Sequence, residues 1–458
     1  MTKTFDVIVI GAGPAGEIAA ARLAEKGGRE VAIVERDLVG GECSFYACMP
    51  SKALLRPQEL LDEVARVPGA AEAVDGHRVD AVATLARRDQ VVNNLDDSNQ
   101  VPWLQSRGIT LVRGSARLDG ERRVIVGDDV LEAREAVIVA TGTAAARPPI
   151  PGLADVAAWT NREITTTSDI PRRLVVLGGG VVGVEMAQAW RSFGSEVVVI
   201  EALDRLLPRE EPFASAQLAA ALVEHGIELH TGVRATAVSQ DEDGEFHVEL
   251  ADGGSASGDR LLLAVGRTPL TDDLGLETVG LKPGGAIAVD DALRVPGLDW
   301  LYAIGDVNGT ALLTHMGKYQ ARVAADRILG DEDARCEVPG PLSPRVIFTD
   351  PQVAAVGHTL QSALDAGIAA KAIDLPTSGT AGASFHGRNA PGTTRFVVDA
   401  EREVLAGVTF VGPDVADFLH AATIAIAGEV PLKRLVHAIP PFPARSELWL
   451  KFIEAWGL

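Results

Sequence analysis

Short apolar runs recur along the chain, and several lead through a glycine turn into a segment with helical spacing. One run, at residues 6–10, is followed by glycines, a helical pattern at 17–25 and a second apolar run at 30–34. The same order returns between residues 173 and 201. Because short apolar runs bounded by turns are typical of buried parallel strands, the repeat predicts two strand–helix–strand units.

The remaining pattern extends this organisation. Residues 51–103 predict a long helical region, and the acidic, proline-bearing stretch 330–344 predicts a domain boundary. Further strands are predicted at 110–112, 123–126, 136–140, 260–265, 301–306, 345–349, 394–398 and 405–410, and further helices at 316–329, 415–427 and 445–455. The predicted fold class is α/β, with two Rossmann-like dinucleotide-binding domains and a C-terminal α+β domain. The predicted domains are residues 1–150 with 270–335, residues 151–269, and residues 340–458.

The first glycine turn has the fingerprint of a dinucleotide site. Gly11 makes the tight turn, Gly13 lets the backbone approach a pyrophosphate, and Gly16 lets helix and strand pack closely. The phosphates then face the N-terminus of the helix. Glu35, at the end of the second strand, is predicted to accept hydrogen bonds from ribose hydroxyls.

The second glycine turn has the same glycine spacing, with Gly178, Gly180 and Gly183 between a predicted strand and a predicted helix, so a second nucleotide site is predicted. Glu201 ends the strand that follows. A carboxylate at this place hydrogen-bonds the ribose 2′-hydroxyl and repels a 2′-phosphate, which predicts NAD(H) in preference to NADP(H).

Between the first strand pair and the helical region lies a pair of cysteines, Cys43 and Cys48, with Lys52 four residues further on. Positions five apart on a regular helix are about 7.5 Å apart along its axis, and a disulfide needs Cα atoms closer than about 7 Å. If the two cysteines pair, the backbone must be distorted there. A lysine one helical turn from Cys48 would favour the reactive thiolate. A structural disulfide or two buried thiols would give the same spacing.

Composition narrows the classes of function. The 458-residue chain has a net charge of −21 and only three cysteines, so nucleic acid, an anionic membrane and a secreted disulfide scaffold are poor expectations. The N-terminus runs directly into a predicted strand, and the apolar runs are short of a membrane span. We therefore predict a cytoplasmic protein, in which a close cysteine pair is more often catalytic than structural. No resident metal is predicted.

Taken together, these motifs resemble those of the class I flavoprotein disulfide reductases, such as dihydrolipoamide dehydrogenase and mercuric reductase. The resemblance covers essentially the whole chain. Beyond the two glycine turns, it rests on Gly41-x-Cys43-x4-Cys48-x-Pro50-Ser51-Lys52, Ala140-Thr141-Gly142, Ala303-x-Gly305-Asp306 and Phe348-Thr349-Asp350-Pro351.

This resemblance implies the roles of the site residues. The first fingerprint would bind FAD, with Asp306 near its ribityl-phosphate region, and the second would bind the nicotinamide nucleotide. Cys48 would be the thiolate beside the flavin, Cys43 the thiol that meets the substrate, and Lys52 would pair with Glu185 near the flavin. Further implied cofactor contacts are Gly41, Thr141, Gly142 and Gly266. The last domain would form a homodimer whose active sites borrow the partner's C-terminal tail.

The tail departs from the family pattern His-Pro-Thr-x-x-Glu, in which the histidine is the acid/base. Phe442 stands in the histidine position of an ungapped match and Ile439 in that of a gapped one, while Glu447 matches the glutamate. His437 is the nearest histidine and is either a replacement base or a surface residue. Loss of a positioned acid/base typically costs about 10²–10⁴-fold in rate.

We therefore predict an FAD-dependent oxidoreductase that passes electrons between NAD(H) and a thiol/disulfide substrate, or a lipoyl-like carrier, through Cys43 and Cys48. The alternatives are an NADH-dependent flavin reductase of quinones, metal ions or a second nicotinamide, and a catalytically weak subunit of a larger complex.

Overall fold

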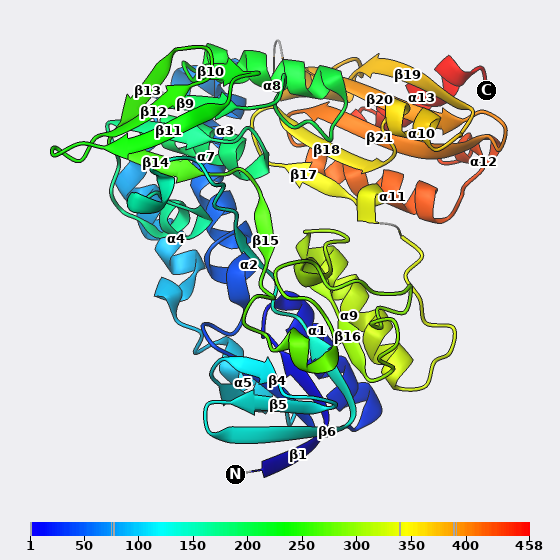
Figure 1. Ribbon diagram of the computed structural model, residues 1–458. Helices are drawn as coiled ribbons and strands as arrows, with labels where there is room; N and C mark the ends of the chain where they lie inside the picture. The colour runs from blue at the N-terminus through cyan, green and yellow to red at the C-terminus, as the bar shows by residue number, and fades with distance from the viewer. Residues whose placement is uncertain (1, 75, 77, 339, 388–389, 391) are drawn as a thin grey trace. The chain divides into compact units, whose positions relative to one another are not determined.

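The computed structural model describes residues 2–74, 76, 78–338, 340–387, 390 and 392–458 (Figure 1). The chain divides into two compact units. The first comprises Met1–Pro50, Arg88–Ala146 and Arg267–Pro341, and the second comprises Ser51–Arg87, Arg147–Gly266 and Leu342–Leu458. No helix in the described residues is both long and apolar enough to cross a membrane.

The first unit is built on a sheet in the order β3-β2-β1-β6-β5-β4, with β16 also paired to β6. Its strands are β1 (Thr2–Ile10), β2 (Val31–Glu35), β3 (Thr110–Arg113), β4 (Ala116–Leu118), β5 (Arg123–Val126), β6 (Asp129–Val139) and β16 (Leu301–Ala303). Strands β3, β2, β1, β6 and β16 are parallel, whereas β5 and β4 fold back antiparallel. Strands β2 and β16 and the last four residues of β1 and of β6 are buried on both faces, as their continuous apolar sequences predict.

Two apolar cores contain the buried side chains of this sheet. One is shared with α1 and α9, and the other includes side chains of β4 and β5 and of the segment 274–300 before β16. The helices assigned wholly to the unit are α1 (Pro14–Gly27), α2 (Gly41–Phe45), α5 (Gln100–Gln105) and α9 (Thr314–Ile328). Alanines and Leu23 of α1 share one apolar core with the alanines of α9, so these two helices pack closely. A ribbon of β7 (Thr143–Ala145) and β15 (Arg267–Pro269) completes the unit.

The second unit contains a parallel sheet in the order β10-β9-β8-β14. Its strands are β8 (Arg173–Leu177), β9 (Glu196–Glu201), β10 (Glu228–Thr231) and β14 (Arg260–Leu263), with helices α6 (Asn161–Thr166), α7 (Val181–Ser192) and α8 (Pro212–Glu224). A separate antiparallel meander is formed by β11 (Ala235–Gln240), β12 (Phe246–Leu250) and β13 (Ser255–Gly258).

The C-terminal part of this unit is an antiparallel sheet in the order β17-β18-β21-β20-β19 (Figure 1). Its strands are β17 (Arg345–Ile347), β18 (Gln352–Gly357), β19 (Ala370–Pro376), β20 (Thr393–Asp399) and β21 (Val404–Gly412), with helices α10 (Leu360–Asp365), α11 (Leu419–Ala427), α12 (Leu432–Leu435) and α13 (Leu448–Trp456). Two parallel sheets, each with its glycine turn, followed by an α+β part, confirm the predicted fold class. The predicted domain boundaries stay a prediction.

Several elements differ from the sequence expectation, and three of these differences bear on the site or on the organisation of the second unit. The region 51–103 is not one helix, because it contains α3 (Cys48–Arg66) and α4 (Ala81–Val91), separated by turns, before α5. The meander β11–β13 was not expected. Helix α9 begins at Thr314, two residues before the predicted start, and this difference matters for the site.

Candidate functional site

The two cysteines lie at a break between two helical segments. Helix α2 contains Cys43 and ends at Phe45, Tyr46 leaves the helical conformation at φ −131°, and α3 begins at Cys48. Both cysteines are partly buried thiols, and the Cys43 thiol hydrogen-bonds to Cys48. The expected distortion between the two residues is therefore present, and it lets the sulfurs face each other.

The dithiol is tied to the first glycine turn through Gly41. Its φ is +59°, and a Cβ on Gly41 would lie 2.9 Å from the Cα of Gly13. A side chain at this position is therefore excluded both by backbone conformation and by space. The close approach places the helix that contains Cys43 directly against the predicted pyrophosphate turn.

The surroundings of Cys43 act on its pKa in both directions. The hydrogen bond to Cys48 raises the pKa of Cys43 above its usual range, and burial raises it further, while Thr314 and Lys318 act in the opposite direction.

Sequence reasoning did not find Thr314, the first residue of α9. Its Oγ1 lies 3.3 Å from Cys48 Sγ. The contact joins residues 266 positions apart, so no local sequence pattern predicts it.

The first glycine turn fits a bound dinucleotide phosphate. A Cβ on Gly11 would lie 2.4 Å from the Ala140 carbonyl oxygen, and one on Gly16 would lie 1.9 Å from the Gly11 oxygen. At Gly13, by contrast, no described atom lies within 4 Å of such a Cβ. Among the described residues, no side chain caps the N-terminus of α1, so its N–H groups are available to an anion. The Glu35 carboxylate accepts the Ala12 N–H at 2.7 Å, which fixes the acid beside the turn.

The second turn repeats this architecture in detail. A Cβ on Gly178 or on Gly183 would meet backbone atoms as closely as one on Gly11 or Gly16 would. At Gly180, as at Gly13, no described atom lies within 4 Å of such a Cβ. The carboxylate of Glu201 accepts the Gly179 N–H at 2.6 Å and the Leu203 N–H at 2.7 Å. In the part of the chain that the structure describes, both predicted nucleotide acids are therefore positioned by backbone N–H donors.

Asp306 lies in a polar cluster of the first unit. It accepts the Thr143 hydroxyl at 3.0 Å, and Arg267 Nε donates to the same hydroxyl at 2.6 Å. Burial raises the pKa of Asp306, while the Thr143 hydrogen bond and the Arg267 charge oppose that rise. Such a partly buried carboxyl group, with one oxygen oriented by Thr143, suits the hydroxyl groups of a polyol chain as partners.

The other implied cofactor contacts are backbone turns or local hydrogen bonds. The Thr141 hydroxyl donates to the Leu270 carbonyl at 3.0 Å. Gly142 and Gly266 have φ of +71° and +134°, values that favour glycine, and open space surrounds both among the described atoms.

Lys52 and Glu185 form the predicted ion pair in the second unit, with Lys52 Nζ 2.8 Å from Glu185 Oε2. Glu185 is only 2% exposed. Its other oxygen accepts the Phe348 N–H at 2.9 Å, and Lys52 Nζ lies 4.7 Å from the centre of the Phe348 ring. The Phe348 motif thus contributes both a donor and an aromatic face to one buried charge pair.

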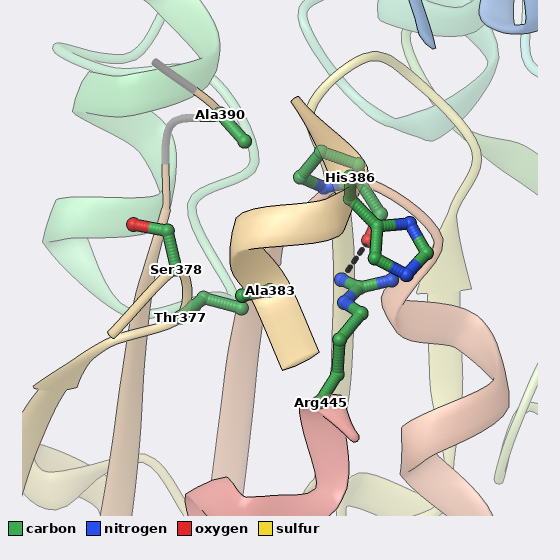
Figure 2. Close-up of a pocket in the computed structure, with 7 residues that line it drawn as sticks. Thr377, Ser378, Ala383, His386, Ala390 and Arg445 are labelled. Carbon is green, nitrogen blue, oxygen red and sulfur yellow. Dashed lines mark hydrogen bonds between the residues drawn. The ribbon is translucent and has the colours of Figure 1, made fainter. Parts of the chain in front are cut away.

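In the C-terminal tail, Glu447 is hydrogen-bonded to the backbone, whereas several residues before Pro443 are exposed to solvent. Glu447 Oε1 accepts the N–H groups of Ala444 and Gly382, both at 3.0 Å. Arg445 borders a small pocket beside His386, where it donates to the Pro413 carbonyl (Figure 2). By contrast, the side chains in the histidine positions are solvent-exposed: Ile439 is 85% and Phe442 79% exposed, and His437 is exposed as well.

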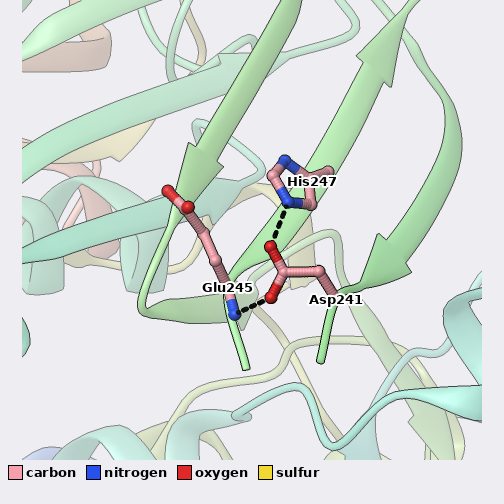
Figure 3. Close-up of side chains that lie close together, drawn as sticks. All are labelled: Asp241, Glu245 and His247. Atoms are coloured by element: carbon pink, nitrogen blue, oxygen red, sulfur yellow. Dashed lines mark hydrogen bonds and ion pairs between the residues drawn. The ribbon is translucent and has the colours of Figure 1, made fainter. Parts of the chain in front are cut away.

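A second cluster lies on the hairpin of β11 and β12. Asp241, Glu245 and His247 offer ligand atoms within 4.8 Å of one another (Figure 3). Asp241 accepts the Glu245 N–H at 2.9 Å and contacts His247 Nε2 at 2.9 Å. These hydrogen bonds account for the arrangement, and we assign no metal to it.

Glu17, in the first turn of α1, gives a testable property of the first unit. Burial raises the pKa of Glu17 to about 7, with Lys318 opposing the rise and Glu35 adding to it. The folded protein therefore holds a proton that the unfolded chain releases above about pH 4.5, so this group lowers stability as pH rises from about 4.5 to 7.

We expect Glu17→Gln to raise the free energy of unfolding by about 2 kcal/mol at pH 8 and by little at pH 4. Denaturant titrations at both pH values measure this difference. Glu25→Gln, on the exposed end of α1, is the matched control, and equal gains at both pH values would contradict the assignment.

Comparisons with known proteins place this architecture in a family. The family model of pyridine nucleotide-disulphide oxidoreductases matches residues 5–326, and the dimerisation domain of the same family matches residues 343–451. The chain belongs to the pyridine nucleotide-disulphide oxidoreductase family. It is a dihydrolipoyl dehydrogenase-like flavoprotein disulfide oxidoreductase with FAD and a pyridine nucleotide as cofactors, and its dimerisation domain supports a homodimer.

Three relatives illustrate the range of the likeness. A dihydrolipoyl dehydrogenase of Thermus scotoductus is 36% identical over 466 residues, covering 99% of this chain and 97% of its own length. A mercuric reductase of Bacillus cereus is 30% identical, covering 97% of this chain and 70% of its own length. The Cu(II) complex of the HOCl-induced flavoprotein disulfide reductase RclA from Escherichia coli has a TM-score of 0.87 and 25% identity, covering 99% of both chains.

Proposed function

We propose that the enzyme passes electrons between NADH and a small thiol/disulfide substrate, or a lipoyl-like carrier, with Cys43 and Cys48 as the redox-active pair. The observation that carries the proposal is the dithiol itself: two facing thiols on a segment whose Gly41 touches Gly13 of the first glycine turn. A purely structural cysteine pair would not need this approach to a dinucleotide turn.

FAD, when bound, would supply two-electron chemistry between the nicotinamide and the cysteine pair. The chain's own residues then have separate tasks. Glu35 and Asp306 orient sugar and polyol hydroxyls, and the N-terminus of α1 binds the phosphates. In the second unit, Lys52 and Glu185 form a charge pair that holds an ammonium group in the N-terminal part of α3.

The cysteine step conserves atoms and electrons. The Cys43 thiolate attacks a substrate disulfide and releases one substrate thiolate, and Cys48 then attacks the Cys43 sulfur and releases the other. The products are a Cys43–Cys48 cystine and two substrate thiols, so the enzyme loses the two electrons that the substrate gains.

NADH is the proposed nucleotide. The carboxylate of Glu201 accepts the N–H groups of Gly179 and Leu203, and a carboxylate here would accept a ribose 2′-hydroxyl and repel a 2′-phosphate. We expect Glu201→Gln to narrow the preference for NADH over NADPH by about tenfold, because the repulsive charge is lost while an acceptor oxygen remains. The measurement is kcat/KM for both nucleotides. Glu196→Gln, at the exposed start of the same strand, should leave the ratio unchanged, and an unchanged ratio in Glu201→Gln itself would remove the basis for the assignment.

The test of the proposed function is an anaerobic NADH titration of the flavoprotein. We expect the first two electrons to produce a long-wavelength thiolate–flavin absorbance while most of the flavin stays oxidised. Complete bleaching of the flavin by two electrons, without that absorbance, would show that the cysteines are not in the electron path.

The tail sequence favours one alternative acceptor class. Phe442 and Ile439, which stand in the histidine positions, cannot exchange protons, so a substrate that needs no general acid would be handled best. Relatives named mercuric reductase make a metal ion a reasonable member of that class. An NADH-driven acceptor panel of lipoamide, low-molecular-weight disulfides, quinones and mercuric ion discriminates these possibilities.

A further inference from the structure

We propose that the first turns of α9, through the Thr314 hydroxyl and the Lys318 ammonium, stabilise the thiolate state of the Cys43–Cys48 pair and so provide within one chain part of the activation that a tail histidine would give. This inference rests on the proposed function, because it assigns a role only to a pair that undergoes exchange.

The first argument is geometric. Thr314 Oγ1 lies 3.3 Å from Cys48 Sγ, within hydrogen-bonding reach of sulfur. A threonine hydroxyl can donate one hydrogen bond, and a thiolate is a better acceptor than a thiol. The contact therefore becomes stronger when Cys48 loses its proton.

The second argument is the convergence of two helix starts. Cys48 is the first residue of α3, and Thr314 is the first residue of α9. Among the described residues, no side chain caps the N-terminus of α9. Each helix N-terminus carries a partial positive charge that favours a nearby anion and lowers the proton affinity of a thiol. Both dipoles act on the same sulfur.

Lys318 adds a full charge from the same face of α9, one turn after Thr314. It is partly buried, and its charge acts on two groups, lowering the pKa of Cys43 and that of Glu17 in α1. The opposing influences on Cys43 are its hydrogen bond to Cys48 and its burial. Lys318 lowers the pKa of Glu17, and Glu35 raises it. Lys52, further along α3, is engaged by Glu185.

The test measures thiolate content directly. The rate of alkylation by iodoacetamide is followed for each cysteine in the reduced holoenzyme between pH 5 and pH 10, with peptide mass spectrometry identifying the site. We expect Thr314→Val, which keeps the side-chain shape, to move the pH midpoint for alkylation of the pair upward by about one unit and to slow alkylation at pH 7 about tenfold. Thr314→Ser should restore the wild-type profile.

The chain provides an internal reference. Cys336 is remote from the pair in sequence, and burial raises its pKa to about 11, so its profile should not respond to changes at Thr314. Lys318→Gln should shift the pair in the same direction as Thr314→Val, whereas Lys318→Arg should not. Superimposable profiles for wild type, Thr314→Val and Lys318→Gln would overturn the inference.

The outcomes separate this inference from the proposed function. If the wild type reduces disulfides and the variants titrate like the wild type, the role of α9 is wrong and the function stands. If the variants shift as expected but no disulfide or dithiol substrate turns over, the stabilisation of the thiolate is supported and the proposed function is wrong.

Discussion

Replacing Cys43 with serine is expected to lower NADH-driven disulfide reduction on the order of 10⁴-fold, because removal of a nucleophile eliminates the covalent step rather than weakening it. Serine is nearly isosteric but is a far weaker nucleophile at neutral pH. Steady-state turnover with lipoamide and with low-molecular-weight disulfides measures the loss.

The same variant should still reduce a quinone at a rate close to that of the wild type, since transfer from a reduced flavin to a quinone does not require Cys43. Cys336→Ser is the matched control, as this cysteine lies outside the site, and it should retain both activities. Disulfide reduction that survives in Cys43→Ser would contradict the thiol route and favour direct transfer to a non-disulfide acceptor.

Replacing Lys52 with methionine is expected to lower the free energy of unfolding of the second unit by about 2–3 kcal/mol. The reason is Glu185, which is 2% exposed and would lose its cation while the Phe348 N–H remains as its partner among the described residues. A buried carboxylate without its cation carries most of its desolvation cost. Urea unfolding followed by tryptophan fluorescence provides the measurement, since Trp159 and Trp190 lie in or against the core that contains α7.

Glu185→Gln separates charge from packing. Glutamine keeps an oxygen that can accept the Phe348 N–H, so the double variant Lys52→Met/Glu185→Gln should recover about half of the lost stability. Equal destabilisation in the single and the double variant would indicate that Lys52 contributes through packing on Phe348 rather than through charge.

The sequence predicted the parallel strands well, because their apolar runs are short, continuous and bounded by glycine turns. Strand β8 was predicted at its observed bounds, Arg173–Leu177. The meander β11–β13 was not predicted because its strands, such as Phe246–Leu250, are short and alternate apolar with polar residues, so they give no continuous apolar run. The helix predicted after Cys48 was too long, because the amphipathic patterns before and after the turns at Gly69 and Gly76 resemble one continuous helix.

The site was predictable where its chemistry is local. The cysteines, the glycine turns and the acids at the strand ends follow from spacing, and the pairing of Lys52 with Glu185 followed from the family resemblance. Thr314 and Lys318 could not be predicted in this way, because their relation to the cysteines is created by the packing of α9 on α1. A threonine at the first position of a helix looks like any loop residue. Similarly, the engagement of Glu447 by Gly382 depends on a contact between segments 65 residues apart.

The two dinucleotide turns are alike in their glycines but not interchangeable, and this has a consequence for protein engineering. The residue after the first glycine is Ala12 in one turn and Gly179 in the other. A Cβ on Gly179 would lie 2.4 Å from a methyl carbon of Leu206, whereas Ala12 is accommodated in its own setting with no exposure to solvent. A chimaera that grafts the N-terminal turn into the later position would therefore import a steric conflict with the leucine. Its repair requires a smaller side chain at residue 206, so a transplant should move the loop together with the neighbour that accommodates it.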